Sequence, residues 1–300
     1  MRKRVKNFFV TLKTAAIQWW DRDPFKESAV IAYYCVFSLP GLLVVIITVA
    51  GYFFGQQAVN GQITQEITAV MGYDTALQVQ DIIAKATESR NSTLATIIGI
   101  VTILVGATGV FVQFQKSLNA IWDVKADTTK SGIWSYVKAR LFSFGLIIAI
   151  AFILIVSLVI SAALSALSNW ITQYFSELFL IVLQFINFIL SLGVLALLFA
   201  GMFKLFPDAK IKWRHVWVGA FLTALLFDIG KLGLGLYFGK AEPGSSYGAA
   251  GSVILILLWT SYSSMIVFFG AEFTHVYAEN VDGKVPPDKN AVNAKTPKTA

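Results

Sequence analysis

Two charged residues stand three positions apart in an apolar stretch, and they are the strongest candidates for chemistry in this sequence. Asp228 and Lys231 are the only charged residues between positions 216 and 238. Residues three apart are neighbours on a helix surface, so the two side chains can pair. A charge at the centre of a membrane costs about 2.5–3.5 kcal/mol, so both side chains should face the protein interior or a water-filled cavity. One interpretation is a polar site in a transport pathway. The alternative is an ion pair or interfacial anchor that only orients the helix.

Weaker polar candidates lie in two other places. Gln184 and Asn187 form a polar stripe in the middle of the apolar stretch 178–203, where hydrogen bonds between helices are the plainer explanation. Glu242 and Tyr247 lie in a glycine-rich turn after position 238. This turn is either a tight hairpin or backbone that lines a vestibule on the outer side of the membrane.

Residues that could support catalysis are sparse. The chain has only two histidines, His215 and His275, and neither belongs to an HxxxH or HxE pattern. A phosphate-binding loop, a GxSxG elbow and a Ser/Cys–His pair are not recognisable. The single cysteine, Cys35, excludes an intramolecular disulfide framework. We therefore expect no enzyme activity, no catalytic residues, no metal and no cofactor.

The elements that must position these residues are predicted to be membrane-spanning helices. Apolar residues make up 56% of the 300 residues and charged residues only 14%, whereas about a quarter of a soluble domain is charged. Long apolar runs can cross a hydrocarbon core of ~30 Å at 1.5 Å per residue. We expect an all-α bundle with six spans, at residues 29–54, 92–114, 141–167, 178–203, 216–238 and 250–273.

Basic residues alternate between the segments that connect these spans. Twenty of the 24 Lys and Arg residues lie in the N-terminal segment, the second–third loop, the fourth–fifth loop and the C-terminal tail, and three lie in the other loops. Loops rich in Lys and Arg stay in the cytoplasm, so both termini are expected inside. Because this topology also accounts for the net charge of +7, we expect no binding to nucleic acid.

Three segments lie outside the spans. Residues 1–28 are basic, with Val5, Phe8, Phe9, Leu12, Ala16 and Trp19 at helical spacing, so we expect a cytoplasmic helix that contacts anionic lipid headgroups. Residues 56–91, within the span domain 29–279, carry two apolar stripes that predict an external helical hairpin. Residues 280–300 are polar and rich in Pro and Lys, which predicts a disordered cytoplasmic tail.

Several segments resemble the YihY/BrkB family of bacterial inner-membrane proteins. The resemblance covers roughly residues 25–280, and its order matches the six predicted spans. It rests on residues 32–40 (AYYCVFSLP), 106–111 (GATGVF), 118–124 (LNAIWDV), 213–220 (WRHVWVGA), 247–251 (YGAAG) and 269–272 (FGAE), with Lys231, Tyr237 and Trp259. The resemblance implies a six-helix inner-membrane protein with virulence associations in some members and an old ribonuclease label. It supplies no catalytic residues.

These observations lead to two hypotheses for function. The first is a transporter or flippase-like exporter in the bacterial inner membrane, whose cargo is an envelope amphiphile. The second is a non-transporting assembly or scaffold protein of the cell envelope that uses the outer hairpin and the cytoplasmic faces. A polar cavity that reaches Asp228 and Lys231 would favour the first hypothesis, and a dry, solid bundle the second.

Overall fold

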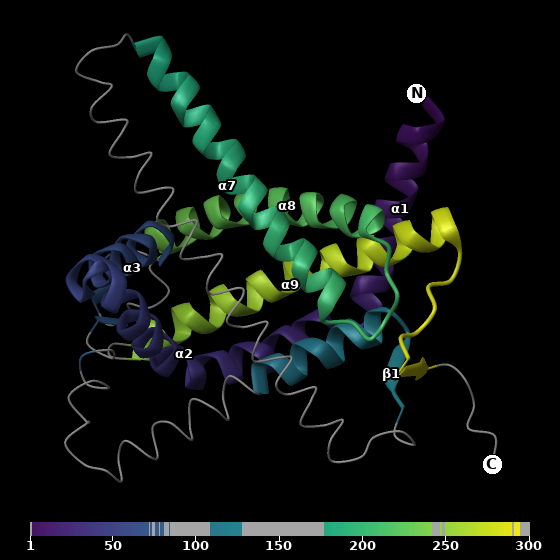
Figure 1. The fold of residues 1–300 in the computed structure, drawn as a ribbon, viewed down its shortest axis with the longest axis horizontal. Helices are drawn as coiled ribbons and strands as arrows, with labels where there is room; N and C mark the ends of the chain where they lie inside the picture. Colours follow the sequence, from purple (N-terminus) through teal and green to yellow (C-terminus); the bar gives the residue numbers. More distant parts are fainter. Residues whose placement is uncertain are drawn as a thin grey trace. The chain divides into compact units, whose positions relative to one another are not determined.

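The structure is a computed structural model that is mostly helical (Figure 1). It describes residues 2–71, 73, 76–77, 79–80, 84, 109–127, 177–241, 247, 250–289 and 291–294. The helices are α1 (Arg2–Asp21), α2 (Pro24–Phe54), α3 (Gln56–Met71), α7 (Glu177–Leu205), α8 (Trp213–Ala241) and α9 (Gly251–Asp282), and residues 109–121 are also helical. Two short strands, β1 (Val124–Ala126) and β2 (Ala291–Asn293), form a two-stranded sheet.

The chain divides into two compact units. The first unit comprises Met1–Leu118 and Leu226–Glu272, and the second comprises Asn119–Leu225 and Phe273–Ala300. Helices α8 and α9 therefore each contribute one part to the first unit and one part to the second.

Three helices of the described chain are long and apolar enough to cross a membrane. The candidate spans are Phe188–Leu205 in α7, Trp213–Phe238 in α8 and Val253–Asp282 in α9. They coincide with the fourth, fifth and sixth spans that the sequence predicts. The first predicted span is helical within α2. Most of the second and all of the third lie outside the described residues.

A tight turn joins α1 to α2 in the first unit. Asp23 has a φ of 55°, in the left-handed region, and its carbonyl accepts the amide of Glu27 at 3.2 Å. Pro24 is the first residue of α2, where its fixed φ suits a helix and its missing N–H has no consequence. At the other end of α2, Gly55 has a φ of 87° and separates α2 from α3. Helix α3 is the first arm of the predicted hairpin 56–91, and the second arm lies mostly outside the described residues.

Helix α1 is attached to α9 by its last turn and the residue that follows it. The indole N–H of Trp19 donates to the carbonyl of Met265 at 3.2 Å, and its ring meets Phe269 edge-on at 5.9 Å. Nε of Arg22 lies 2.9 Å from Oε2 of Glu272, a side chain with no exposed surface. Helix α1 therefore packs against protein as well as carrying its basic charge.

The buried face of α1 differs from the predicted stripe. Thr11 and Ala15 are buried, whereas Phe9 and Ala16 are exposed. The predicted stripe was expected to lie in the membrane interface, and three of its members, Phe8, Phe9 and Ala16, are exposed. The small side chains of Thr11 and Ala15 lie on the buried face, and Trp19 contacts α9.

Close packing in the first unit depends on glycine. A Cβ at Gly230 of α8 would lie 2.7 Å from Cδ1 of Ile266 and 2.8 Å from Cε1 of Tyr262, both in α9. Gly235 and Gly239 form a G-xxx-G pattern, which permits close packing between membrane helices. A Cβ at Gly235, however, would meet no described atom within 4 Å, so the close approach seen here lies more than one turn earlier, at Gly230.

The C-terminal segment is fastened to two loops of the second unit. Strands β1 and β2 are antiparallel, with Lys125 opposite Val292. The amide of Lys210 donates to the carbonyl of Pro286 at 2.9 Å, and the amide of Asp288 donates to the carbonyl of Asp208 at 2.8 Å. The prediction of disorder from residue 280 was therefore wrong for most of this segment. The prediction used the polar side-chain composition of the segment, but backbone hydrogen bonds hold the segment in place, and composition does not reveal them.

Candidate functional site

Asp228 and Lys231 lie on the flank of α8. Both side chains are half-buried, between a buried face that includes Gly230 and an exposed ridge that includes Ile229 and Leu232. Lys231 lies close enough for its charge to act on the Asp228 carboxylate. The two residues are thus neighbours at the edge of the packed surface, and the prediction that they face the interior stays a prediction.

Of the other four candidate residues from the sequence, the structure describes the side chain of Tyr247 alone. Gln184 and Asn187 belong to α7 in the second unit, and their side chains lie outside the described part of the structure. Glu242 also lies outside it, while Tyr247 is exposed. The proposed vestibule and the polar stripe of α7 therefore remain predictions from the sequence.

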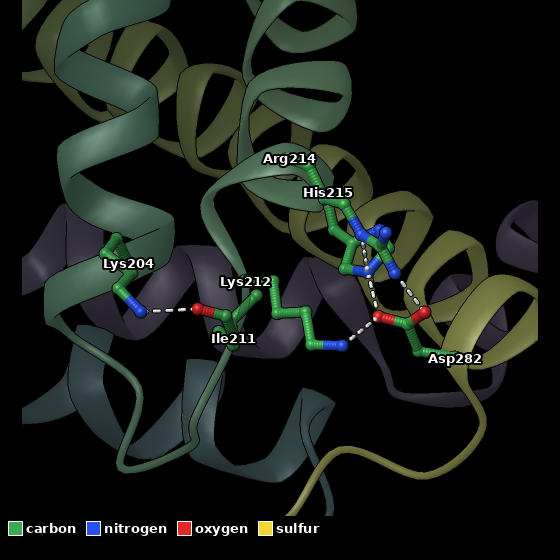
Figure 2. A network of polar contacts seen from close by, with 6 residues as sticks. All are labelled: Lys204, Ile211, Lys212, Arg214, His215 and Asp282. Atoms are coloured by element: carbon green, nitrogen blue, oxygen red, sulfur yellow. Dashed lines mark hydrogen bonds and ion pairs between the residues drawn. The ribbon is translucent and has the colours of Figure 1, made fainter.

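A cluster that sequence reasoning missed lies in the second unit, where the start of α8 meets the end of α9. Figure 2 shows three cationic or imidazole side chains that point toward the Asp282 carboxylate. Nζ of Lys212 lies 2.9 Å from Oδ2, Nε2 of His215 lies 2.7 Å from the same oxygen, and the Arg214 guanidinium pairs with Oδ1. Asp282 is therefore the shared partner of three residues that are nearly consecutive in the sequence.

The proton of His215 can be placed from these contacts. A separation of 2.7 Å between Nε2 and a carboxylate oxygen requires that Nε2 carries a hydrogen. Nε of Arg214 lies 3.3 Å from the same nitrogen, which cannot accept a hydrogen bond while it carries its own hydrogen. His215 is only 2% exposed, and its Nδ1 has no hydrogen-bond partner among the described residues. Among the described residues, the imidazole is therefore hydrogen-bonded to the cluster through Nε2 alone.

Asp282 keeps its negative charge in this setting. Hydrogen bonds from His215, Lys212 and Arg214 hold the pKa of its carboxyl well below the usual range. The 32 residues of α9 extend about 48 Å, and Asp282 is the last of them. A hydrocarbon core of ~30 Å that began near Val253 would therefore end before Asp282.

The start of α8 explains why a carboxylate is needed. The amides of His215 and Val216 point to the carbonyl of Lys212, at 3.0 and 3.3 Å, so the helix begins here. A helix N-terminus carries partial positive charge, which makes adjacent Lys and Arg unfavourable and a carboxylate favourable. Clustered basic residues at a helix start therefore indicate a nearby negative charge. The residue that supplies it, Asp282, is 67 or more positions away in the sequence, so the local sequence does not identify it.

Neighbouring contacts brace the loop before α8. Nζ of Lys204 donates to the carbonyl of Ile211 (Figure 2) and lies 5.8 Å from the centre of the Trp213 ring. Asn119 holds Asp208 twice: its Nδ2 donates to Oδ2, and its Oδ1 accepts the backbone amide, both at 2.7 Å. The loop is thus fixed from both sides.

A second polar cluster, in the first unit, surrounds Glu27. Nε2 of Gln113 donates to Oε2 of Glu27 at 2.8 Å, and Oγ of Ser117 donates to the same atom at 2.5 Å. These contacts connect α2 to the helical residues 109–121. Within the described ranges, no three His, Cys, Asp or Glu side chains gather where they could hold a metal ion.

The long apolar helices α7, α8 and α9 define the chain as a helical membrane protein. The comparison with known families agrees with this class. The chain belongs to the family described as Virulence factor BrkB, whose model matches residues 15–295. The family that the sequence resembles is therefore confirmed.

Individual relatives carry mainly descriptive names. A Tolumonas auensis protein named UPF0761 membrane protein is 26% identical over 273 residues, covering 87% of this chain and 82% of the relative. An Alteromonas mediterranea protein with the same description is 30% identical over 199 residues, covering 65% and 63%. A Bacillus subtilis protein named as ribonuclease-like, YfkH, is 26% identical over 268 residues, covering 88% and 92%. No solved structure matches this chain.

Proposed function

We propose that the protein is a multi-pass transporter or flippase-like exporter of the bacterial inner membrane, and that its cargo is an envelope amphiphile. The observation that supports this most directly is the half-buried position of Asp228 and Lys231 within the apolar helix α8. Ionisable residues inside membrane helices are costly and commonly mark pathways. A cargo headgroup would meet these charges while its chains lie against the exposed ridge at Ile229 and Leu232.

The proposed topology has six spans and both termini in the cytoplasm. Its support is the distribution of Lys and Arg over alternate loops and the coincidence of α7, α8 and α9 with three predicted spans. In this arrangement the cluster around Asp282 lies on the cytoplasmic side and Tyr247 on the outer side.

We also propose that α1 contacts anionic lipid headgroups through the side opposite Ala15. Phe9, Ile17 and Trp20 are exposed there together with Lys13. Apolar side chains that enter the headgroup boundary beside a lysine are typical of helices that lie on a membrane surface.

Leaflet-resolved lipid profiling tests the transport proposal. A deletion strain is compared with strains that carry the wild-type protein or the double variant Asp228→Asn/Lys231→Met. We expect one lipid class to accumulate in the inner leaflet without the protein. Wild type should restore its distribution, and the double variant should not, although it reaches the membrane in normal amount. An unchanged distribution in the deletion strain would contradict transport.

A non-transporting assembly or scaffold protein is the second candidate, and the fastened C-terminal segment favours it. Its backbone bonds to the loops at Asp208 and Lys210 create an ordered surface at the ends of the helices. Such a surface suits a binding partner. This candidate predicts that the double variant in α8 supports cell-envelope function as well as wild type does.

We propose, finally, that the chain does not cleave RNA, despite the name of the Bacillus subtilis relative. His215 and His275 are both buried, and in the described part of the chain His215 contacts the carboxylate of Asp282 and His275 that of Glu279. Protein purified free of contaminating nucleases should leave RNA intact with or without divalent metal. Metal-dependent cleavage that His215→Ala or His275→Ala abolishes would contradict this.

A further inference from the structure

The first half of α8 carries an exposed aromatic and apolar ridge in the second unit. Trp213, Trp217, Phe221 and Leu225 are all exposed and repeat at intervals of four residues, so they follow one line along the helix. The two tryptophans stand at the end where the helix begins, which is the position that indole rings prefer at a membrane–water boundary. This ridge has the composition of a surface that faces lipid chains.

Basic side chains stand directly at the headgroup end of this ridge. Arg214 is three residues before Trp217 and seven before Phe221, so it shares their side of the helix. The side chains of Lys212 and Arg214 are 64% and 58% exposed, although both pair with Asp282. An ammonium has three N–H donors and a guanidinium five, so pairing with one carboxylate leaves donors for a second anion.

The local charge also favours an anion. Residues 204–214 contain Lys204, Lys210, Lys212 and Arg214 against one acidic residue, Asp208. Asp282 offsets only part of this excess. The surface is therefore complementary to a molecule with a negative head and apolar chains, and a soluble phosphate would leave the ridge below it uncovered.

We propose that the start of α8 binds an anionic phospholipid, with its phosphate on Lys212 and Arg214 and its acyl chains along Trp217, Phe221 and Leu225. Asp282 competes with the phosphate for the same two cations and so limits the affinity. This binding does not depend on transport, because a scaffold protein in the same membrane would present the same surface.

The test uses full-length protein in a mild detergent, delipidated and then incubated with phosphatidylglycerol or with phosphatidylcholine of the same chain lengths. Native mass spectrometry measures the lipid retained. We expect preferential retention of phosphatidylglycerol that weakens as salt is raised, because salt screens exposed charge pairs. Lys212→Gln/Arg214→Gln should weaken it by about tenfold, since both charge-assisted contacts are lost. Asp282→Asn should strengthen it.

Lys240→Gln is the matched control, since it removes one exposed charge from the other end of the same helix. It should leave phosphatidylglycerol retention unchanged. Equal retention of the two lipids by the wild-type protein would overturn the proposal, and this measurement needs no variant to fold. Three other results would also overturn the proposal. The Lys212→Gln/Arg214→Gln variant could retain as much phosphatidylglycerol as wild type, or Lys240→Gln could lose as much retention as that variant. Glycerol 3-phosphate at an equal concentration could also displace the phosphatidylglycerol.

Discussion

At the scale of single residues, three carboxylates of the described chain lie beside a basic side chain. Asp282 pairs with Lys212 and Arg214 at the start of α8, and Arg22 lies beside the fully buried carboxylate of Glu272. Asp228 and Lys231 follow the same rule inside an apolar helix. An isolated charge at low dielectric is costly, and a nearby opposite charge reduces that cost.

The pair in α8 therefore leads to a prediction about single and double variants. Asp228→Asn and Lys231→Met, made separately, should each lower stability by about 1–3 kcal/mol, because each leaves one polar group without its partner. The double variant should lose less than either single one. Thermal unfolding of detergent-purified protein and the yield in membranes measure this. Equal tolerance of all three variants would mean that both side chains simply reach the outer interface.

At the scale of elements, two helices approach closely where a glycine allows it. Gly230 lies against Ile266 and Tyr262, whereas a Cβ at Gly233 in the same helix would meet no atom of the described residues within 4 Å. A glycine that contacts nothing only weakens a helix, while one at a crossing is required for the packing.

Alanine at these two positions should have opposite effects. Gly230→Ala places a methyl group where α9 already lies and should cost about 1–3 kcal/mol. Gly233→Ala, the matched control, should be neutral or stabilise by about 0.5–1 kcal/mol, since alanine favours a helix. The midpoint of thermal unfolding distinguishes them. A Gly230→Ala variant as stable as wild type would show that α8 and α9 do not approach here.

The C-terminal segment gives a second prediction at this scale. Amide hydrogen exchange should be slow at Lys210, Asp288 and Ala294, whose N–H groups donate to Pro286, Asp208 and Asp123. Exchange as fast as in an unstructured peptide at all three would contradict the fastened segment. The amide of Lys284, an exposed residue, serves as an internal reference for rapid exchange.

At the scale of the whole molecule, the sequence predicts the positions of helices better than the contacts between elements. Continuous apolar runs identify α7, α8 and α9, and Pro24 marks the start of α2. These signals are local. The pairing of Asp282 with Arg214, and of β2 with β1, joins residues far apart in the chain, so no local pattern records it. The hydrogen bond from Trp19 to Met265 is another contact of this kind.

Topology is the prediction that belongs to the whole molecule. In a Cys35→Ser background, single cysteines at Lys125 and Lys210 should react only after the membrane is permeabilised. Cysteines at Gln62 and Tyr247 should react with a membrane-impermeant reagent from outside. This follows from the preference of basic loops for the cytoplasm. External labelling at Lys125 would exclude the six-span arrangement.

The attachment of α1 to α9 has a consequence for the order of biosynthesis. Trp19 and its acceptor Met265 are separated by 246 positions, so the first helix leaves the ribosome long before its docking site exists. At about 5–20 residues per second, the delay is roughly 10 to 50 seconds. Throughout that interval the indole of Trp19 has no access to this acceptor. Synthesis of α9, and not membrane insertion of the early part of the chain, is then the event that permits the first unit to close.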